Sequence, residues 1–175
     1  IVRGVDEELK RSNYDLMLYT THRHSGKESL YVNTIANGLT DGLLLIVPLV
    51  ASAYLDALRQ RNFPYVLIDQ WDAADKSSVV DATNWQGAYD ATRYLLESGH
   101  RRIAFITGLM ELSSAVDRFE GYKAALADHD VPCLDELVVD GDFWQSSAIT
   151  ATKQLLALPQ PPTAIFAAND LSAYG

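Results

Sequence analysis

The chain has 175 residues, of which 48% are hydrophobic and 21% charged, enough apolar content for one substantial core or two small ones. Its net charge of −9 would repel a phosphate backbone, which argues against DNA contact by this segment itself. Cys133 is the single cysteine, so there is no disulfide framework, and a reducing, cytoplasmic setting fits. The apolar runs fall far short of the roughly 20 residues that cross a bilayer, so we expect no transmembrane segment.

Short apolar runs alternate with longer segments of helical period along the chain. The apolar runs, several of which are typical of strands buried on both faces, lie at 14–20, 42–48, 65–69, 78–82, 103–107, 137–139 and 164–167. The segments that predict helices lie at 26–37, 51–61, 83–98, 114–129 and 143–158. This alternation of strand and helix predicts an α/β fold with parallel, doubly wound sheets.

The helix predicted over 83–98 carries the clearest signals. Thr83 and Gln86 match a capping box, an apolar stripe includes Leu95, and Gly99 ends the helix. The polar link at 69–78, by contrast, contains no helical segment. We expect the chain to cross between two lobes at that link.

Three segments in the second half of the chain carry more specific patterns. They read GA at 87–88 followed by YLLESGHRRIAFITG at 94–108, DRFEGY at 117–122, and PTAIFAANDLSAYG at 162–175. In this order and spacing they resemble the central signature, the Arg-x-x-Gly-aromatic motif and the Pro-Thr-Ala segment of the lactose-repressor (LacI/GalR) family. Weaker strand motifs at 41–45 and 64–69 extend the resemblance along nearly the whole chain.

The resemblance implies a two-lobed core like that of the type I periplasmic binding proteins, each lobe a doubly wound parallel sheet flanked by helices. We expect the N-terminal lobe, without its first strand, over 1–82 and an incomplete C-terminal lobe over 83–175. The family further implies a transcriptional repressor that senses a small-molecule effector such as a sugar and acts as a homodimer. Its operator DNA would be bound through a helix-turn-helix headpiece outside this chain, and no cofactor is implied.

Three polar residues are candidates for effector binding. In open α/β sheets, ligands bind beyond the carboxyl ends of the strands, and Asp69 ends one predicted strand while Asn169 follows another. By resemblance, Arg118 reaches the same cleft from the helix after Gly108. Carboxylate and amide oxygens accept hydrogen bonds from sugar hydroxyls, and Arg and amide nitrogens donate to sugar oxygens. We therefore expect these three side chains to bind the effector.

An aromatic side chain is also expected, because a flat ring can cover the apolar face of a sugar. Phe143 is the first candidate, with Trp144 and Trp71 behind it. Two departures from the family pattern affect the same region: Thr83 stands where the family usually places Asp, and Gln70 where many sugar-binding relatives carry Arg. The second departure removes a fixed charge from the pocket edge, so the ligand of those relatives does not transfer to this chain.

Each candidate also has a purely structural alternative. Arg118 could pair with an acidic neighbour at the surface, where such pairs contribute little. Asp69 could only start a turn, and Phe143 could be a core residue, as most aromatic residues are. Asn169 and Asp170 could form no more than a helix cap, and Asp170 is the expected cap residue.

No catalytic or metal-binding arrangement stands out. His100 follows a helix-ending glycine without a partner cluster, the histidine spacings fit no metal site, and neither a hydrolase elbow nor a Gly-rich phosphate loop is present. We therefore expect no enzyme activity and no metal. The main alternative to a regulator is an exported sugar-binding protein of a transporter, which would share the cleft and remain monomeric. An enzyme of the same doubly wound class is a third possibility.

Overall fold

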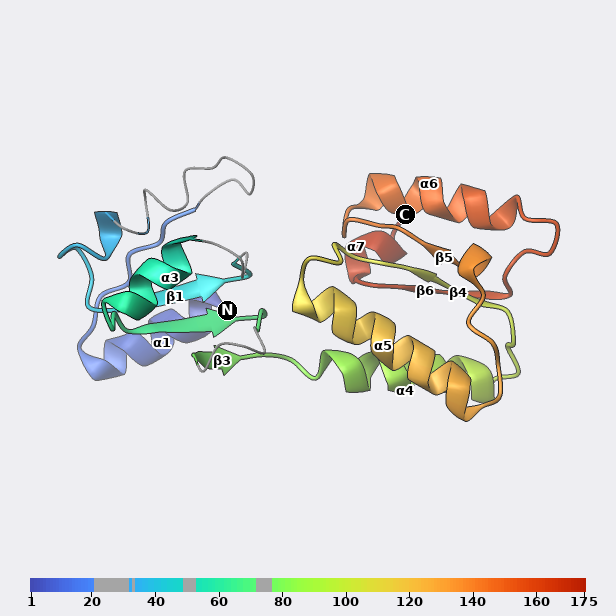
Figure 1. Ribbon diagram of the computed structural model, residues 1–175, viewed down its shortest axis with the longest axis horizontal. Coiled ribbons are helices and arrows are strands. Elements are labelled where there is room, and N and C mark those ends of the chain that lie inside the picture. The colour runs from blue at the N-terminus through green and yellow to red at the C-terminus, as the bar shows by residue number, and fades with distance from the viewer. Residues whose placement is uncertain (21–31, 33, 49–52, 72–76) are drawn as a thin grey trace.

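The computed structural model describes residues 1–20, 32, 34–48, 53–71 and 77–175. These residues carry two separate three-stranded parallel sheets, which lie side by side with helices packed against them (Figure 1). The α/β class and the parallel sheets predicted from the alternating pattern are thereby confirmed. None of the helices in the described part is both long and apolar enough to span a membrane.

The first sheet consists of β1 (Leu43–Ile46), β2 (Tyr65–Ile68) and β3 (Ser78–Val80), in that order. All pairs are parallel, with Leu43 opposite Tyr65 and Val66 opposite Ser78. Because β3 is hydrogen-bonded to β2, the chain is still in the first lobe when it leaves the 69–78 link. The predicted crossing at that link is therefore wrong, and the chain passes to the other sheet after Val80 (Figure 1).

The core of the first lobe lies between this sheet and α3 (Ala53–Gln60). Leu55, Leu58 and Leu67 are almost completely buried there, and Leu43 and Leu45 pack against them. The intervening β1 side chains, those of Leu44 and Ile46, are 45% and 44% exposed. Within the described residues, the strands of this sheet are therefore not buried on both faces. Helix α1 (Val2–Ser12) adds no buried side chain.

Two further elements predicted near the N-terminus differ from the prediction or lie mostly outside the described residues. Residues 14–20, predicted as a strand, are irregular and exposed, because no neighbouring strand among the described residues forms a ladder with them. An apolar, alternating sequence is not sufficient for a strand when its backbone groups find no partner. Most of the helix predicted at 26–37 lies outside the described residues; positions 32, 34 and 35 are helical.

The second sheet has the strand order β5-β4-β6, with β4 (Ile103–Ile106) in the centre. Its neighbours are β5 (Val138–Val139) and β6 (Ala164–Ala167), both parallel to it. Helices α4 (Asn84–Glu97) and α5 (Ser113–Asp128) cover one face, and α6 (Gln145–Leu156) covers the other (Figure 1). The short elements η1 (Asp135–Leu137) and α7 (Asp170–Ala173) precede β5 and follow β6.

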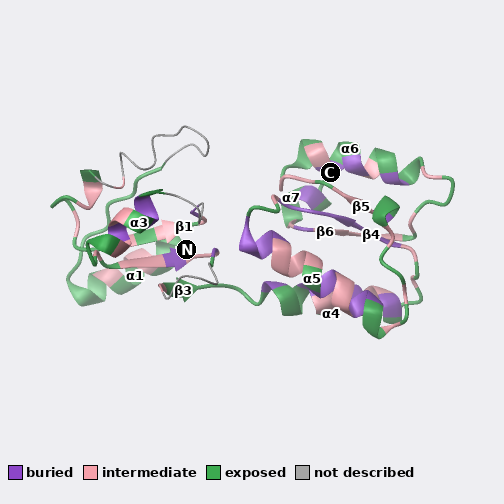
Figure 2. Ribbon diagram, in the orientation of Figure 1, coloured by how far each residue is buried: buried purple, intermediate pink, exposed green. Residues whose placement is uncertain are grey.

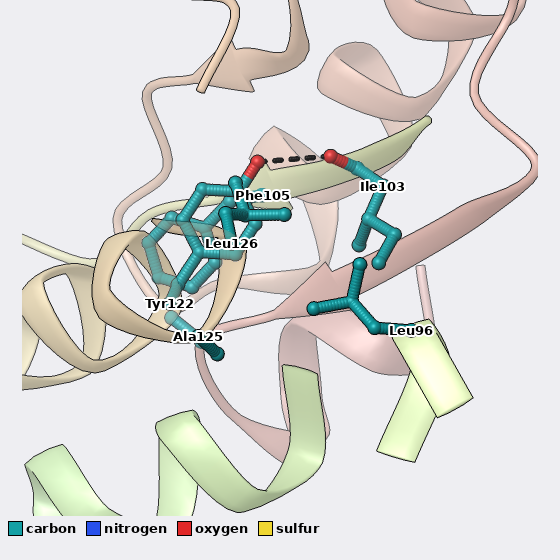
Figure 3. Packing of buried hydrophobic residues seen from close by; sticks show 7 residues of the cluster. Leu96, Ile103, Phe105, Tyr122, Ala125 and Leu126 are labelled. Carbon is teal, nitrogen blue, oxygen red and sulfur yellow. Dashed lines mark hydrogen bonds between the residues drawn. The ribbon is translucent and has the colours of Figure 1, made fainter. Parts of the chain in front are cut away.

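Strand β4 is the clearest case of a strand buried on both faces, as predicted (Figure 2). Ile103 and Phe105 face α4 and α5, whereas Ala104 and Ile106 pack against the α6 side. Figure 3 shows the first of these clusters, in which the buried Tyr122 hydroxyl donates to the Ile103 carbonyl at 2.9 Å. The bond satisfies the polar end of a ring that is otherwise fully desolvated.

The predicted capping box at the start of α4 is wrong. Thr83 is the N-cap, but its side chain makes no capping hydrogen bond. Just before the helix, the carboxylate of Asp81 accepts from the backbone N–H of Ala82 at 2.7 Å and from the side-chain amide of Asn84 at 3.0 Å. The other end of the helix behaves as predicted, because Gly99 has φ 98° and takes the left-handed conformation that ends a helix.

Leu96→Ala is expected to lower the free energy of unfolding by about 2–5 kcal/mol, because the side chain is 1% exposed and its removal leaves a cavity among Ile103, Tyr122 and Leu126. Urea unfolding measures this. Leu95, on the stripe expected from sequence, is only partly buried, so Leu95→Ala should cost less. Equal costs for the two variants would contradict the helix orientation seen here.

Candidate functional site

Arg118 of α5 is the centre of a polar network at the carboxyl ends of the strands. Its Nε and Nη2 donate to Asn84 Oδ1 at 3.0 and 2.8 Å, and its Nη1 donates to the Ala168 carbonyl at 2.6 Å. Three of the five guanidinium N–H groups are thus used, which leaves one on each terminal nitrogen for another partner. The arginine therefore joins α4 to the end of β6 and still offers two donors.

The surface-pair alternative for Arg118 is not what the structure shows. Its two acidic sequence neighbours have other partners: Asp117 accepts from the Trp71 indole at 3.1 Å, and Glu120 pairs with Lys123 at 2.7 Å. Arg118 is also half-buried rather than exposed. It is therefore held by neutral acceptors, and its positive charge is not neutralised by a carboxylate ion pair among the described residues.

Phe143 contacts this arginine from the side of α6. The Arg118 Cζ atom lies 6.0 Å from the centre of the phenyl ring. The ring also covers Gly108, where a Cβ atom would collide with it, and it packs against the core between β4 and α5. Phe143 has φ 71°, an uncommon conformation for an aromatic residue, so the surrounding contacts hold it in place. Phe143 is therefore both a core residue and a neighbour of Arg118.

Asn169 completes this side of the site. Its Oδ1 accepts from the Ser172 N–H at 2.9 Å and its Nδ2 donates to the Phe143 carbonyl at 3.1 Å. Asn169 is thus the N-cap of α7, and the prediction that Asp170 is the cap is wrong: Asp170 is the first residue inside the helix. The second N–H of the Asn169 amide is left for another acceptor.

Asp69 lies on the first-lobe side of the network. A second carboxylate, that of Asp81, lies on the same side and was not predicted from the sequence. Asp69 follows β2 with φ 57°, and its N–H donates to the Val80 carbonyl at 3.0 Å. Asp81 comes just after β3, which is hydrogen-bonded to β2, so the two carboxylates follow neighbouring strands. Partial burial raises the pKa of the Asp81 carboxyl and the charge of Asp69 raises it further, while the hydrogen bond from the Ala82 N–H and the charge of Arg118 act in the opposite direction.

A cavity of about 320 Å³ opens beside these groups. Its lining residues come from the start of α4, from α5 and from the end of β6; they are Ala82, Thr83, Asn84, Gly87, Ala88, Arg118, Phe166, Ala167, Ala168, Asn169, Asp170 and Ala173. Of the four predicted ligand residues, Arg118 and Asn169 line the cavity. Phe143 contacts both of them. Asp69 follows β2, which pairs with the strand that leads to Asp81. The structure thus brings Arg118, Phe143 and Asn169 together, and Asp69 lies outside the lining of the cavity.

Another hollow, of about 540 Å³, lies at the β5 edge of the second sheet, away from this cluster. Its charged lining residues, Asp135, Glu136 and Asp140, are all acidic and exposed. We place the candidate site at the smaller cavity, because only there do donors, acceptors and an aromatic ring converge. Of the two weaker aromatic candidates, Trp144 is 65% exposed, and Trp71 is turned to Asp117.

Gln70 forms a hydrogen-bonded clamp between the two lobes. The Gln70 side chain is only 2% exposed, and its Oε1 accepts from the Ser113 N–H at 2.9 Å and from the Ser113 hydroxyl at 3.0 Å. The same hydroxyl accepts from the Trp71 N–H at 3.1 Å. Because Ser113 is the first residue of α5, a side chain of the first lobe caps a helix of the second.

Gln70→Ala is expected to destabilise the folded state by about 1–3 kcal/mol, because it leaves the buried Ser113 N–H and hydroxyl without their acceptor. Chemical denaturation gives the value. Gln86→Ala is the matched control, since Gln86 bonds only to Asp90 on the exposed face of α4. If both glutamine variants were equally stable, the clamp would not hold the lobes together in solution.

Sequence reasoning missed three residues of this cluster, namely Gln70, Asp81 and Asn84. Gln70 was read as a lost charge at the pocket edge, whereas it is a buried inter-lobe contact. A usable signal existed for Asp81: it is the next-to-last residue of the run predicted as a strand at 78–82, close to the criterion that selected Asp69. Asn84 was assigned to the helix start, and nothing in its local sequence shows that it holds Arg118.

With this geometry in place, comparison with known proteins gives the family. The profile described as periplasmic binding proteins and sugar binding domain of LacI family matches residues 1–175. The chain belongs to this family. It is 34% identical over 178 residues to the HTH-type transcriptional repressor PurR of Pectobacterium carotovorum (strain PC1), and 29% identical over 176 residues to catabolite control protein A of Priestia megaterium. Both alignments include 100% of this chain but only 52% and 53% of those proteins, so it spans about half their length.

Solved structures of LacI-family regulators share the architecture. The transcriptional regulator CelR in complex with cellobiose superposes with a TM-score of 0.90 and 31% identity, covering 98% of this chain and 53% of that one. A LacI-type putative regulator from Bacillus cereus subsp. cytotoxis gives a TM-score of 0.89 and 30% identity, covering 98% of this chain and 61% of that one. The family and the fold class expected from the sequence motifs are thereby confirmed.

Proposed function

We propose that this chain is the effector-sensing core of a cytoplasmic, DNA-binding transcriptional repressor of the LacI family. The observation that carries the proposal is the cavity beside Arg118, where two guanidinium donors and the Asn169 amide remain open. The relatives matched over the whole chain are transcriptional regulators, and one of them is described in complex with a sugar, cellobiose. No enzyme activity is part of the proposal.

The proposed site comprises Asp69, Arg118, Phe143 and Asn169. Arg118 and Asn169 would donate to ring and hydroxyl oxygens, Asp69 would accept from hydroxyls, and Phe143 would hold Arg118 in place while offering an apolar surface. The effector would lie between an N-terminal lobe over 1–82 and a C-terminal lobe over 83–175. This boundary is supported by the two separate sheets and by the end of β3 at Val80.

Effector binding would act by changing the angle between the lobes. An effector shifts such an equilibrium only if it binds the two arrangements unequally. The Gln70 clamp joins the lobes in the arrangement seen here, and its hydrogen bonds would break if the lobes rotated apart. In a homodimer this change would alter how two headpieces outside this chain meet the half-sites of an operator. The acidic charge of the chain fits a core that leaves DNA contact to those headpieces.

The alternative of an exported sugar-binding protein is less well supported. The matching family profile includes periplasmic binding proteins in its description, but the curated relatives that match the whole chain are repressors and a catabolite control protein. The two functions differ in one measurable property, since only the regulator binds a specific DNA sequence.

A two-part experiment on the full-length protein tests the proposal. A thermal-shift screen against sugars, sugar phosphates and nucleosides should give one saturable ligand, with roughly 2.7 kcal/mol of stabilisation at a hundredfold excess over its Kd. Binding to a DNA duplex selected from random sequence should then change roughly fivefold or more when that ligand is added. Ligand binding without specific DNA binding would favour the transport alternative, and specific DNA binding that no compound changes would contradict effector sensing.

A further inference from the structure

Asn84 is a buried polar residue at the point where the chain enters the second lobe. It is the first residue of α4, directly after the crossing segment 81–83, and it is only 7% exposed. Its Nδ2 donates to Asp81 Oδ1 at 3.0 Å and to the Ala82 carbonyl at 3.4 Å. Its Oδ1 accepts from Arg118 Nε at 3.0 Å and from Nη2 at 2.8 Å. Both amide N–H groups and both lone pairs of the oxygen are therefore used, as burial of an amide requires.

We propose that Asn84 is the positioning residue of Arg118, which directs the guanidinium to the cavity and links its orientation to the crossing segment. The inference rests on the proposed function, because that function gives Arg118 its role in effector binding. Helix α5 brings Arg118 to the cavity, but a side chain of this length has many rotamers. The two hydrogen bonds to Asn84 select one of them.

The two ends of the Asn84 amide are held by different parts of the molecule. Its nitrogen faces the two acceptors of the crossing segment, the Asp81 carboxylate and the Ala82 carbonyl. If the amide were turned over, its N–H groups would meet those of the guanidinium, and its oxygen would meet these two acceptors. The oxygen is therefore directed at Arg118. Since the Ala168 carbonyl accepts from Nη1, the guanidinium is fixed from both α4 and the end of β6.

Asn84 contributes to effector binding through Arg118 rather than by direct contact. It lines the cavity, but none of its donors or lone pairs is left for an effector. Hydrogen bonds from a charged donor are strong, so a neutral amide is sufficient to hold the guanidinium, and it leaves the positive charge in place. A guanidinium that is already oriented loses less conformational freedom when an effector binds. Asn84 therefore prepares Arg118 for binding without neutralising it.

The Arg118 Nε–H group reports its own hydrogen bond, so the proposal can be tested before the effector is known. In full-length protein with isotope-labelled arginine, its NMR signal is identified by its loss in Arg118→Lys. Asn84→Ala should make the exchange of this proton with water roughly tenfold or more faster, because its acceptor is gone. Asn84→Asp keeps an acceptor oxygen at the same place and should retain the slow exchange. Leu96→Ala is the control for lost stability, since Leu96 packs in the core of the second lobe.

The link to the crossing segment has a separate test at Asp81, which is exposed and outside the cavity lining. Asp81→Ala should also accelerate exchange at Arg118, by roughly twofold or more, because the Asn84 amide loses its stronger acceptor. Asp81→Asn should restore the wild-type rate, since its amide oxygen can still accept from Asn84. The matched control is Asp90→Ala, which removes a carboxylate from the exposed face of α4.

The outcomes separate the positioning role from the proposed function. An unchanged exchange rate in Asn84→Ala, or an equal acceleration in Leu96→Ala or Asn84→Asp, overturns the positioning role. Equal rates in Asp81→Ala and Asp90→Ala overturn the link to the crossing segment. If Asn84→Ala does not fold, the comparison of Asp81→Ala with Asp81→Asn decides. A thermal-shift screen in which no compound binds counts against effector sensing, whereas the exchange rate of Arg118 still decides what orients it.

Discussion

Arg118→Ala will abolish the response to effector while the protein remains folded. Hydrogen bonds to a charged group contribute about 1.5–3 kcal/mol each, so the loss of even one of the two open donors should weaken effector binding by roughly 10- to 150-fold. The variant should also lose about 1–3 kcal/mol of stability, because the Ala168 carbonyl and Asn84 Oδ1 lose their donor. Calorimetric titration and urea unfolding on the same samples separate the two effects.

Arg93→Ala is the matched control for Arg118, since Arg93 lies on the exposed face of α4, where it pairs with Asp90 and Glu97 and lies over the Tyr89 ring. It should change neither effector affinity nor stability measurably. Asn84→Ala should give an intermediate loss of affinity, because it frees the guanidinium from the two bonds that orient it. Unchanged effector affinity in Arg118→Ala would make the arginine a structural link between α4 and β6 and remove it from the site.

The second lobe was the more predictable part of the fold. Its central run is apolar without interruption over 103–106, and β4 is accordingly buried on both faces. The helices predicted at 83–98, 114–129 and 143–158 lie within two residues of the observed α4, α5 and α6 at their ends. These elements are determined by local periodicity and by packing on an adjacent sheet, and both leave a trace in the sequence.

Failures in the first lobe come from tertiary contacts that local sequence does not encode. Residues 14–20 have the composition of a strand, but no described strand pairs with them. Leu44 and Ile46 look like core residues in an apolar run, yet only the alternate positions of β1 meet α3. Whether an apolar residue is buried depends on what covers its face of the sheet, and a residue count along the strand does not show this.

The candidate site was only partly predicted for the same reason, because its contacts are not encoded in local sequence. Arg118 was found through the family resemblance, and Asp69 and Asn169 through their places at the ends of predicted strands. Their hydrogen-bond partners were not found, because Asn84 and Arg118 are 34 residues apart and Gln70 and Ser113 are 43 apart. Polar side chains that meet across such distances have no periodic pattern. The cap at Asn169 rather than Asp170 is a smaller error of the same kind, set by one hydrogen bond to Ser172.

Gly121→Ala will destabilise the second lobe more than any other single methyl addition among its helical glycines. A Cβ atom at this position in α5 would collide with the backbone oxygen of Trp85 and lie 3.0 Å from the Tyr89 nitrogen. Those atoms belong to the α4 backbone and cannot rotate away, so the two helices must separate. Overpacking of this kind costs about 1–3 kcal/mol or more, which outweighs the gain of about 1 kcal/mol in helix propensity.

Gly87→Ala is the control that isolates packing from backbone entropy. Gly87 is also helical, but nothing lies within 4 Å of an added Cβ, so this variant should gain about 0.4–1 kcal/mol. Thermal and urea unfolding should therefore move in opposite directions for the two substitutions. Adding Ala88→Gly to Gly121→Ala removes the neighbouring side chain at 3.1 Å but leaves the Trp85 carbonyl in place, so it should not restore stability. Full rescue would show that α4 and α5 approach through side chains rather than through their backbones.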